Sequence, residues 1–417
     1  MTVTQRRAAA ATAPPAPAAE TAPPAQPAVA TLGLVAALVL GNAVFREAGS
    51  TMLWLYVIGV ALGLVLFHSR FGFTSAWRQL VAVRQGKALR AHMLMLAVAC
   101  ILFAPILAGG VSLAGEANGF VSPVGAGLFV GALLFGVGMQ LGGSCASGTL
   151  FAIGSGQTAI LITLAGFIGG SVLGAYHFAF WTETMPTGPT VSLADTPLGY
   201  PGALGVSLLA MAAIAASTVL VARRRRRPEP APPPVAQGAS RAWRGSWPLW
   251  VGALLLAALN ATTLLVSGTP WGVTSAFALW GSKLISAFGV DVAAWPYWAA
   301  PENAPKLEAS VLADKTSVMD LGIILGALIA SALAGSFVVH RRIPGRLALG
   351  AVLGGLLMGY GARIAYGCNI GAYFGGIASF SLHGWLWGAL AIAGTFVGLR
   401  LRPIFGLTNP RPDDSVC

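Results

Sequence analysis

Charged residues are scarce in this sequence. Asp, Glu, Lys and Arg make up 9% of the 417 residues, whereas hydrophobic residues make up 56% and the mean hydropathy is +0.75. A soluble domain of this length does not carry so much apolar material. The unbroken apolar run from Thr51 to Phe67 also lacks the alternation of a β-barrel strand. We therefore expect an all-α polytopic membrane protein.

Metal-binding, disulfide and phosphate-binding patterns are also missing. The four cysteines, Cys100, Cys145, Cys368 and Cys417, have no short paired spacing, and the five histidines form no pair at helical spacing. No glycine-rich phosphate-binding loop followed by Lys and Ser or Thr occurs. We expect no metal site, no cofactor and no ATP hydrolysis by that route.

Acidic residues are the rarer charged type, because 13 Asp and Glu stand against 25 Lys and Arg, giving a net charge of +12. Five basic residues form the run Arg223 to Arg227, and the other clusters also follow apolar segments. We interpret this excess as membrane topology and expect no binding of nucleic acid. The acidic residues nearest the spans fall at span ends or in loops, which favours flow that is not coupled to protons. These residues are Glu47, Glu116, Glu183 and Asp320.

Ten apolar segments are candidate membrane spans. They lie near residues 31–45, 51–68, 91–110, 123–141, 158–180, 202–222, 247–268, 317–340, 345–362 and 382–400. Basic clusters follow the second, sixth, eighth and tenth of them. Because positive charge is retained on the inner side, both termini are expected in the cytoplasm.

Composition divides the chain into five parts. The expected parts are an Ala/Pro-rich disordered tail at 1–30, a first transmembrane repeat at 31–222, a basic Pro-rich cytoplasmic linker at 223–246, a second transmembrane repeat at 247–405 and a C-terminal tail at 406–417.

An internal repeat relates the two halves. The motif FGFTSAW at 71–77 aligns with WGVTSAF at 271–277, and GALLFGVGMQLGGSCASGTLF at 131–151 aligns without gaps with GGLLMGYGARIAYGCNIGAYF at 354–374. The first short motif follows a span that ends inside, and its copy follows a span that ends outside. We therefore predict two inverted-topology repeats, with a substrate site at their interface near the middle of the bilayer.

Each copy of the longer motif breaks an apolar span with glycines around one cysteine, in GGSCASG and GCNIG. Such a break is tolerated in a membrane where protein or a polar cavity surrounds it, and the free N–H groups of the following helix suit an anion. Glycines also serve helix packing, and buried cysteine commonly acts as a small hydrophobe. We favour function for Cys145 and Cys368 because both halves keep them, packing for Cys100 and no role for Cys417.

Arg363 lies at the second break and aligns with Gln140. An arginine at membrane depth faces a cavity or a partner, so Arg363 is either an anion attractor or a clamp on carbonyl groups, and both interpretations stand. The candidate substrate-binding residues are Cys145, Cys368, Gly143, Ser144, Gly148, Gly367, Asn369, Gly371 and Arg363.

Over residues 31 to 405 the chain resembles the YeeE/YedE family, whose characterised members take up thiosulfate. The segments GVGMQLGGSCASGTLFAIGSG and GYGARIAYGCNIGAYFGGIASFSLHGWLWG are similar to its YedE branch. The resemblance implies two inverted halves with short re-entrant helices in the bacterial inner membrane. It also implies that the thiols of Cys145 and Cys368 pass the anion along, and that a small cytoplasmic sulfur-carrier protein is a partner. Gly72 and Gly272 stand where thiosulfate-transporting relatives carry a further cysteine in the first motif.

We expect a permease and not an enzyme, in contact with membrane lipids and acting on a small sulfur-containing anion. Thiosulfate is the first candidate, and sulfite or a selenium species are alternatives. Neutral thiols donate weak hydrogen bonds to soft sulfur and release it easily, as conduction requires. The rival hypotheses are a membrane thiol-redox or persulfide relay, and a scaffold that hands sulfur or selenium to a cytoplasmic carrier protein.

Overall fold

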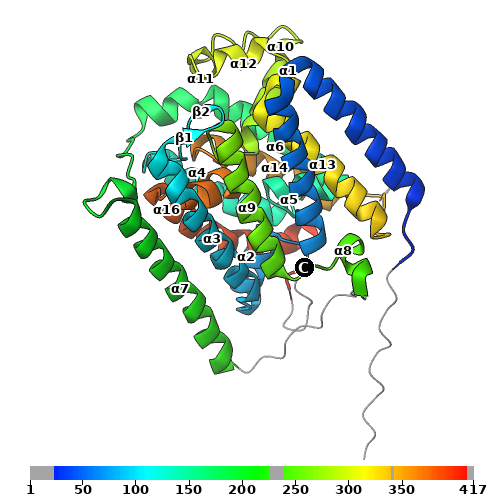
Figure 1. Cartoon of the computed structure of the whole chain (residues 1–417), viewed down its shortest axis with the longest axis horizontal. Coiled ribbons are helices and arrows are strands. Elements are labelled where there is room, and N and C mark those ends of the chain that lie inside the picture. Colours follow the sequence, from blue (N-terminus) through cyan, green and yellow to red (C-terminus); the bar gives the residue numbers. More distant parts are fainter. Residues whose placement is uncertain (1–22, 226–237, 340–341, 411–417) are drawn as a thin grey trace, which may run out of the picture.

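A computed structural model describes residues 23–225, 238–339 and 342–410, which form a bundle of helices (Figure 1). Nine stretches of these residues are long and apolar enough to cross a membrane, which confirms an all-α polytopic membrane protein. Cys417 and most of the expected tail at 1–30 lie outside the described residues. So does the middle of the expected linker at 223–246.

Long helices form the body of the bundle. They are α1 (Pro27–Ser69), α3 (Lys87–Gly109), α4 (Ala126–Leu141), α6 (Ala159–Tyr176), α7 (Gly199–Arg225), α9 (Leu249–Ser267), α13 (Lys315–Leu333), α14 (Gly345–Ile364) and α16 (Leu382–Leu401).

The first two expected spans are two arms of the single helix α1, so nine stretches stand among the described residues where ten were expected. Gly49, with φ 81° and ψ −172°, breaks α1 between the arms, and glycine takes this conformation without a Cβ clash. Figure 1 shows the two blue arms meeting at an angle, the second running down the middle of the bundle. That helix packs against α9 and α13.

Short elements connect the long helices. The α-helices among them are α2 (Phe73–Val83), α5 (Ala146–Gly154), α8 (Arg241–Arg244), α10 (Thr274–Ser286), α11 (Pro296–Ala299), α12 (Ala304–Glu308) and α15 (Gly376–Ala378). The others are the π-helices η1 (Phe180–Thr184) and η5 (Asn369–Gly375) and the 3₁₀ helices η2 (Leu193–Asp195), η3 (Gly238–Ser240), η4 (Val311–Ala313) and η6 (Arg402–Phe405). The strands β1 (Val111–Ser112) and β2 (Gly115–Glu116) pair antiparallel.

The helices α4 and α14, which carry the two copies of the long repeat, cross each other at glycines. A Cβ on Gly131 would lie 2.5 Å from the carbonyl oxygen of Gly361, and a Cβ on Gly138 would lie 2.6 Å from that of Gly354. The repeat aligns Gly131 with Gly354 and Gly138 with Gly361. The two contacts are therefore equivalents of each other, as in an interface with two-fold symmetry.

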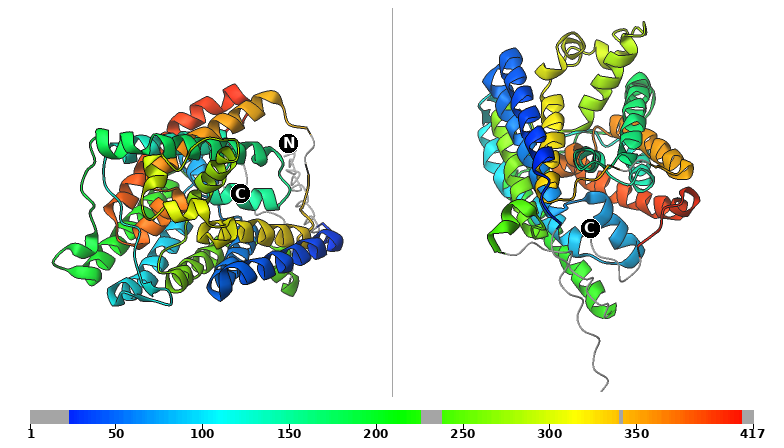
Figure 2. Two further views of the ribbon diagram at one scale, coloured as in Figure 1. Left: turned by 90° about the horizontal axis from the view of Figure 1, so that it is seen from above. Right: turned by 90° about the vertical axis from the view of Figure 1, so that its right-hand side faces the viewer.

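The same reciprocity extends to the neighbouring helices. α4 packs against α16 while α14 packs against α6, and α1 packs against α13 while α9 packs against α3. Each of these contacts joins one half of the chain to the other, so the hydrophobic core lies between the halves. Figure 2 shows the early and late segments interleaved in both views.

The glycine contact between α4 and α14 gives a stability prediction. Gly361→Ala is expected to lower the thermal midpoint in detergent, because its Cβ would lie 2.4 Å from the carbonyl oxygen of Gly131, and overpacking of this kind costs about 1–3 kcal/mol. The matched control is Gly169→Ala in α6, whose Cβ would meet Leu356 at an ordinary 3.6 Å. Equal midpoints for the two variants would show that the crossing can relax.

Candidate functional site

The two cysteines occupy the same local structure. Cys145 precedes the first residue of α5 with φ −89° and ψ −173°, and Cys368 precedes η5 with φ −97° and ψ −170°. Two residues before each cysteine the backbone is left-handed, at Gly143 with φ 83° and at Tyr366 with φ 57°. The sequence repeat is thus also a repeat of backbone conformation, and each cysteine begins a short helix after a break.

Both thiols are buried. Cys145 is 2% exposed and Cys368 is 1% exposed. The Sγ of Cys145 lies 3.7 Å from the Oγ of Ser147, whereas the Sγ of Cys368 accepts a hydrogen bond from the N–H of Ile370 at 3.4 Å. The helices α5 and η5, which the two cysteines precede, are in contact.

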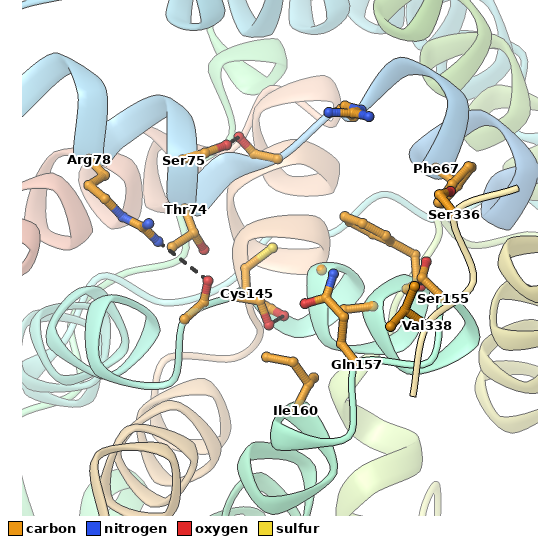
Figure 3. A pocket seen from close by; sticks show the side chains of 17 residues that line it. Phe67, Thr74, Ser75, Arg78, Cys145, Ser155, Gln157, Ile160, Ser336 and Val338 are labelled. Carbon is orange, nitrogen blue, oxygen red and sulfur yellow. Dashed lines mark hydrogen bonds between the residues drawn. The ribbon is translucent and has the colours of Figure 1, made fainter. Parts of the chain in front are cut away.

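A first cavity of about 520 Å³ opens in front of Cys145. Figure 3 shows Cys145, Thr74 and Arg78 around this cavity, which Gly143, Ser144 and Gly148 also line. A Cβ on Gly148 would lie 3.2 Å from the Sγ of Cys145. Glycine at this position therefore leaves the space beside the thiol free.

A second cavity of about 500 Å³ is built from the equivalent residues of the other half. The aligned pairs that line the first and second cavities are Gly72 and Gly272, Thr74 and Thr274, Ser75 and Ser275, Gly143 and Tyr366, Ser144 and Gly367, and Gly148 and Gly371. The equivalence is incomplete, because Cys145 lines the first cavity while Cys368 is not among the residues that line the second. Cys368 lies between Gly367 and Asn369, directly behind that wall.

Equivalent hydrogen bonds hold the breaks to the short helices. The side-chain amide of Gln140 donates to the carbonyl oxygen of Thr74 at 3.4 Å, and Arg363, aligned with Gln140, donates to that of Thr274 at 2.9 Å. Arg363 also donates to the hydroxyl of Tyr297, and its guanidinium lies 4.8 Å from the centre of that ring. Arg363 therefore acts as a carbonyl clamp and at the same time lines the second cavity.

The first cavity has an arginine too, and the sequence alone did not single it out. Arg78 of α2 donates to the side-chain oxygen of Gln140 at 3.0 Å and to the carbonyl oxygen of Gly143 at 3.3 Å. In sequence it counts as one of the basic residues that orient the spans. Its position directly after the motif FGFTSAW is the one signal by which the sequence analysis could have found it.

Asn369 is fully buried, and neither its side-chain oxygen nor its nitrogen has a hydrogen-bond partner in the part of the chain that the structure describes. Ser144, by contrast, pairs its hydroxyl with that of Thr149 at 2.8 Å. Cys100, for which packing was expected, is buried in α3 and lies 3.5 Å from the carbonyl oxygen of Ile377. The structure thus collects the candidate residues around two cavities and the layer between them.

Asp320 lies near the start of a span, as expected, at the sixth residue of α13, but its exposed fraction is 0%. The sequence did not predict this burial, because position along a span does not show which neighbours cover a residue. Here α1 and α5 both pack against α13.

Comparison with known proteins bears on this arrangement. A family model described as sulphur transport matches residues 68–397. The thiosulfate transporter TsuA of Spirochaeta thermophila is 28% identical over 362 residues, which cover 83% of this chain and 97% of that protein. The Escherichia coli TsuA is 26% identical over 349 residues, which cover 79% and 88%.

A third relative is the probable transporter YedE of Escherichia coli, which is 38% identical over 143 residues. That match spans about a third of each chain, 34% in both cases. All three relatives are described as transporters, which agrees with the expectation that the chain is not an enzyme. These matches confirm the resemblance to the YeeE/YedE proteins, and the chain belongs to the sulphur transport family.

Proposed function

We propose that the protein conducts a small sulfur-containing anion, with thiosulfate as the first candidate, across the bacterial inner membrane. The observation that carries this proposal is the pair of cavities lined by aligned residues, with Cys145 in the wall of the first and Cys368 next in the chain to Gly367 in the wall of the second. The anion would enter one cavity, pass the two thiols and leave through the other. TsuA relatives that match most of the chain and are described as thiosulfate transporters support this choice of substrate.

The charge distribution supports an inverted arrangement of the two halves. Arg70 and Arg78 line the first cavity, and α7 ends in a run of arginines. Because basic residues are retained on the inner side, the first cavity would open to the cytoplasm, where the termini would also lie. A small cytoplasmic sulfur carrier would receive the anion there, and lipids would cover exposed apolar side chains such as Leu38 and Trp54.

Neutral thiols suit the narrow layer between the cavities. A sulfhydryl group donates a weak hydrogen bond, so it can replace part of the hydration of an anion without holding it tightly. Asn369 adds a buried amide with no partner among the described residues, beside Cys368. The charged guanidinium groups of Arg78 and Arg363 stand at the cavity walls, where they would concentrate anions without trapping them in the layer.

Gly72 and Gly272 line the two cavities, so the cysteine that relatives carry in the first motif would add a thiol to the wall of the first cavity. Its absence keeps sulfite and selenium species open as substrates beside thiosulfate. Uptake of thiosulfate, sulfite and selenite into the same proteoliposomes would rank them. Flux by the purified protein alone would also exclude a role limited to scaffolding.

The redox relay is the less favoured function because the relatives that match most of the chain are described as transporters. A relay would need a thiol that exchanges disulfides or carries a persulfide, at Cys145 in the wall of the first cavity or at Cys368. Intact-mass measurement after mild reduction distinguishes the relay from conduction. Plain thiols agree with conduction, and a stable persulfide would favour the relay.

The thiols give the first transport prediction. Cys145→Ala and Cys368→Ala are each expected to lower thiosulfate uptake into proteoliposomes about fivefold, since a hydrogen bond contributes about 1 kcal/mol. Cys100→Ala in α3 is the matched control, because that cysteine is equally buried but lies inside a regular helix and not at a break. Wild-type uptake in both pore variants would remove the thiols from the mechanism.

The aligned pair Gln140 and Arg363 gives the second transport prediction. Arg363→Gln puts into the second half the side chain that clamps the equivalent carbonyl in the first half, so the fold should persist while the positive charge is lost. We expect slower thiosulfate uptake with weaker dependence on salt, because the attraction it removes is electrostatic.

The control for this variant is Arg346→Gln, at the exposed start of α14. It removes the same charge away from the cavity and should leave uptake unchanged. If Arg363→Gln also transports at the wild-type rate at low salt, Arg363 is only a structural clamp.

A further inference from the structure

Asp320 is an acidic side chain inside the bundle, and no neighbouring group among the described residues would compensate the negative charge of its carboxylate. None of its surface is exposed, and neither carboxyl oxygen finds a hydrogen-bond partner within residues 23–225, 238–339 and 342–410. A buried carboxylate without a partner is strongly disfavoured, whereas the neutral acid is tolerated far better. The environment therefore favours the protonated form of Asp320.

The cations near α13 are engaged elsewhere. Lys315, at the start of α13, donates to both oxygens of Thr269 and to the carbonyl of Pro270. Lys283 of α10 donates to the carbonyls of Leu307 and Ala309, and Arg241 of α8 to that of Ser246.

The other elements packed against α13 offer little charge. α5 and η4 carry no titratable side chain, and Tyr56 of α1 donates its hydroxyl to the carbonyl of Ala37. Arg46 and Glu47 of α1 are exposed beside its kink, and His68 packs against Trp247 at its end. Arg244 of α8 donates to the carbonyl of Pro23.

Two further features relate Asp320 to its surroundings. Asp314 caps α13 by accepting hydrogen bonds from the N–H and the hydroxyl of Ser317, so its charge stands at the start of the same helix. The helix α13 packs against α5, and α5 contacts η5, which Cys368 precedes. Asp320 therefore lies in a helix that reaches, through α5, the site at which the anion would pass.

Two hydroxyl groups lead from the second cavity toward Asp320. Ser275 lines that cavity, and its hydroxyl donates to the hydroxyl of Thr316 at 2.9 Å. Thr316 and Asp320 are four residues apart in α13, so they lie one above the other on the same face of the helix. No hydrogen bond joins Thr316 to the carboxyl within the described residues, so a proton from the cavity would cross this last gap to reach Asp320.

The first half has a titratable group at the corresponding place. Lys87 begins α3 as Lys315 begins α13, and the sixth residue of α3 is His92, which is 1% exposed with Nδ1 unpaired within the described chain. Its ring lies 5.0 Å from that of Phe71 and 4.5 Å from that of Phe73, in the first short motif. Both halves thus bury a titratable side chain beside the site.

We propose that Asp320 is a proton-binding site that couples anion transport to proton entry from the second cavity; this inference rests on the proposed function. An ionised Asp320 would repel an anion at Cys368, whereas the neutral acid would not. By linkage, a bound anion favours the protonated carboxyl to the same extent that a bound proton favours the anion. A proton on Asp320 and an anion at Cys368 would therefore stabilise each other, as entry of both in one transport cycle requires.

Coupling also answers an energetic problem of dianion uptake. An inside-negative potential of about 100 mV lowers the equilibrium accumulation of a dianion roughly 2,000-fold. Each proton that accompanies the anion removes one charge from the transported unit. At equal thiosulfate concentrations on the two sides, an uncoupled path would favour export under this potential.

The test uses the full chain in proteoliposomes that hold a pH-sensitive dye, with the membrane potential clamped and labelled thiosulfate outside. Under an inward proton gradient, wild type is expected to acidify the lumen when thiosulfate is added. It should also accumulate thiosulfate about tenfold per pH unit for each coupled proton. Asp320→Asn should do neither, and Asp320→Glu should retain the acidification.

The matched control is Asp291→Asn, an exposed carboxyl in the loop after α10, which should behave as wild type. The proton site is refuted if thiosulfate uptake by wild type does not depend on the proton gradient. It is also refuted if acidification persists in Asp320→Asn. Neither result contradicts the proposed transport function. If Asp320→Asn does not fold, wild type and Asp320→Glu still decide the question. Absence of thiosulfate uptake in wild type under every condition overturns the proposed function and the coupling with it.

Discussion

A broken backbone inside an apolar bundle needs hydrogen-bond partners, and this requirement shapes the site. Two breaks precede Cys145 and Cys368, and each is tied to a short helix of the same half by a polar side chain. Gln140 and Arg363 bind the carbonyls of Thr74 and Thr274. Because those clamps stand beside the two cavities, the groups that satisfy the backbone also set the polarity of the proposed path.

The two halves hold their backbone breaks with side chains of different charge. In the first half the arginine is Arg78 of α2, which binds the neutral Gln140 and the break itself. In the second half Ala278 takes the place of Arg78, and the arginine stands at Arg363, the position of Gln140. Each cavity therefore has a guanidinium group, which comes from the short helix α2 in the first half and from the end of α14 in the second. Divergence has preserved the charge of the site more strictly than the residue.

The buried polar groups of the proposed path are thiols, an amide and a carboxyl. Cys145 and Cys368 are buried thiols, Asn369 is a buried amide, and the carboxyl of Asp320 has no hydrogen-bond partner among the described residues. Fixed charges stand farther out, at Arg78 and Arg363. This distribution fits a path that gathers anions at its ends and binds them weakly in the middle, where a proton on Asp320 would decide whether an anion is accepted.

The sequence by itself determined the class of protein, the repeat and the two cysteine breaks, because apolar length, glycine spacing and internal similarity are local properties. Burial and partners depend on helices far apart in the chain, so only the tertiary structure decided the rest. It joined the first two expected spans into α1, left Cys368 out of the lining of the second cavity, gave Arg78 a role beyond topology and buried Asp320 completely. A pattern along one helix shows where a side chain stands in that helix, but its surroundings come from the helices that pack against it.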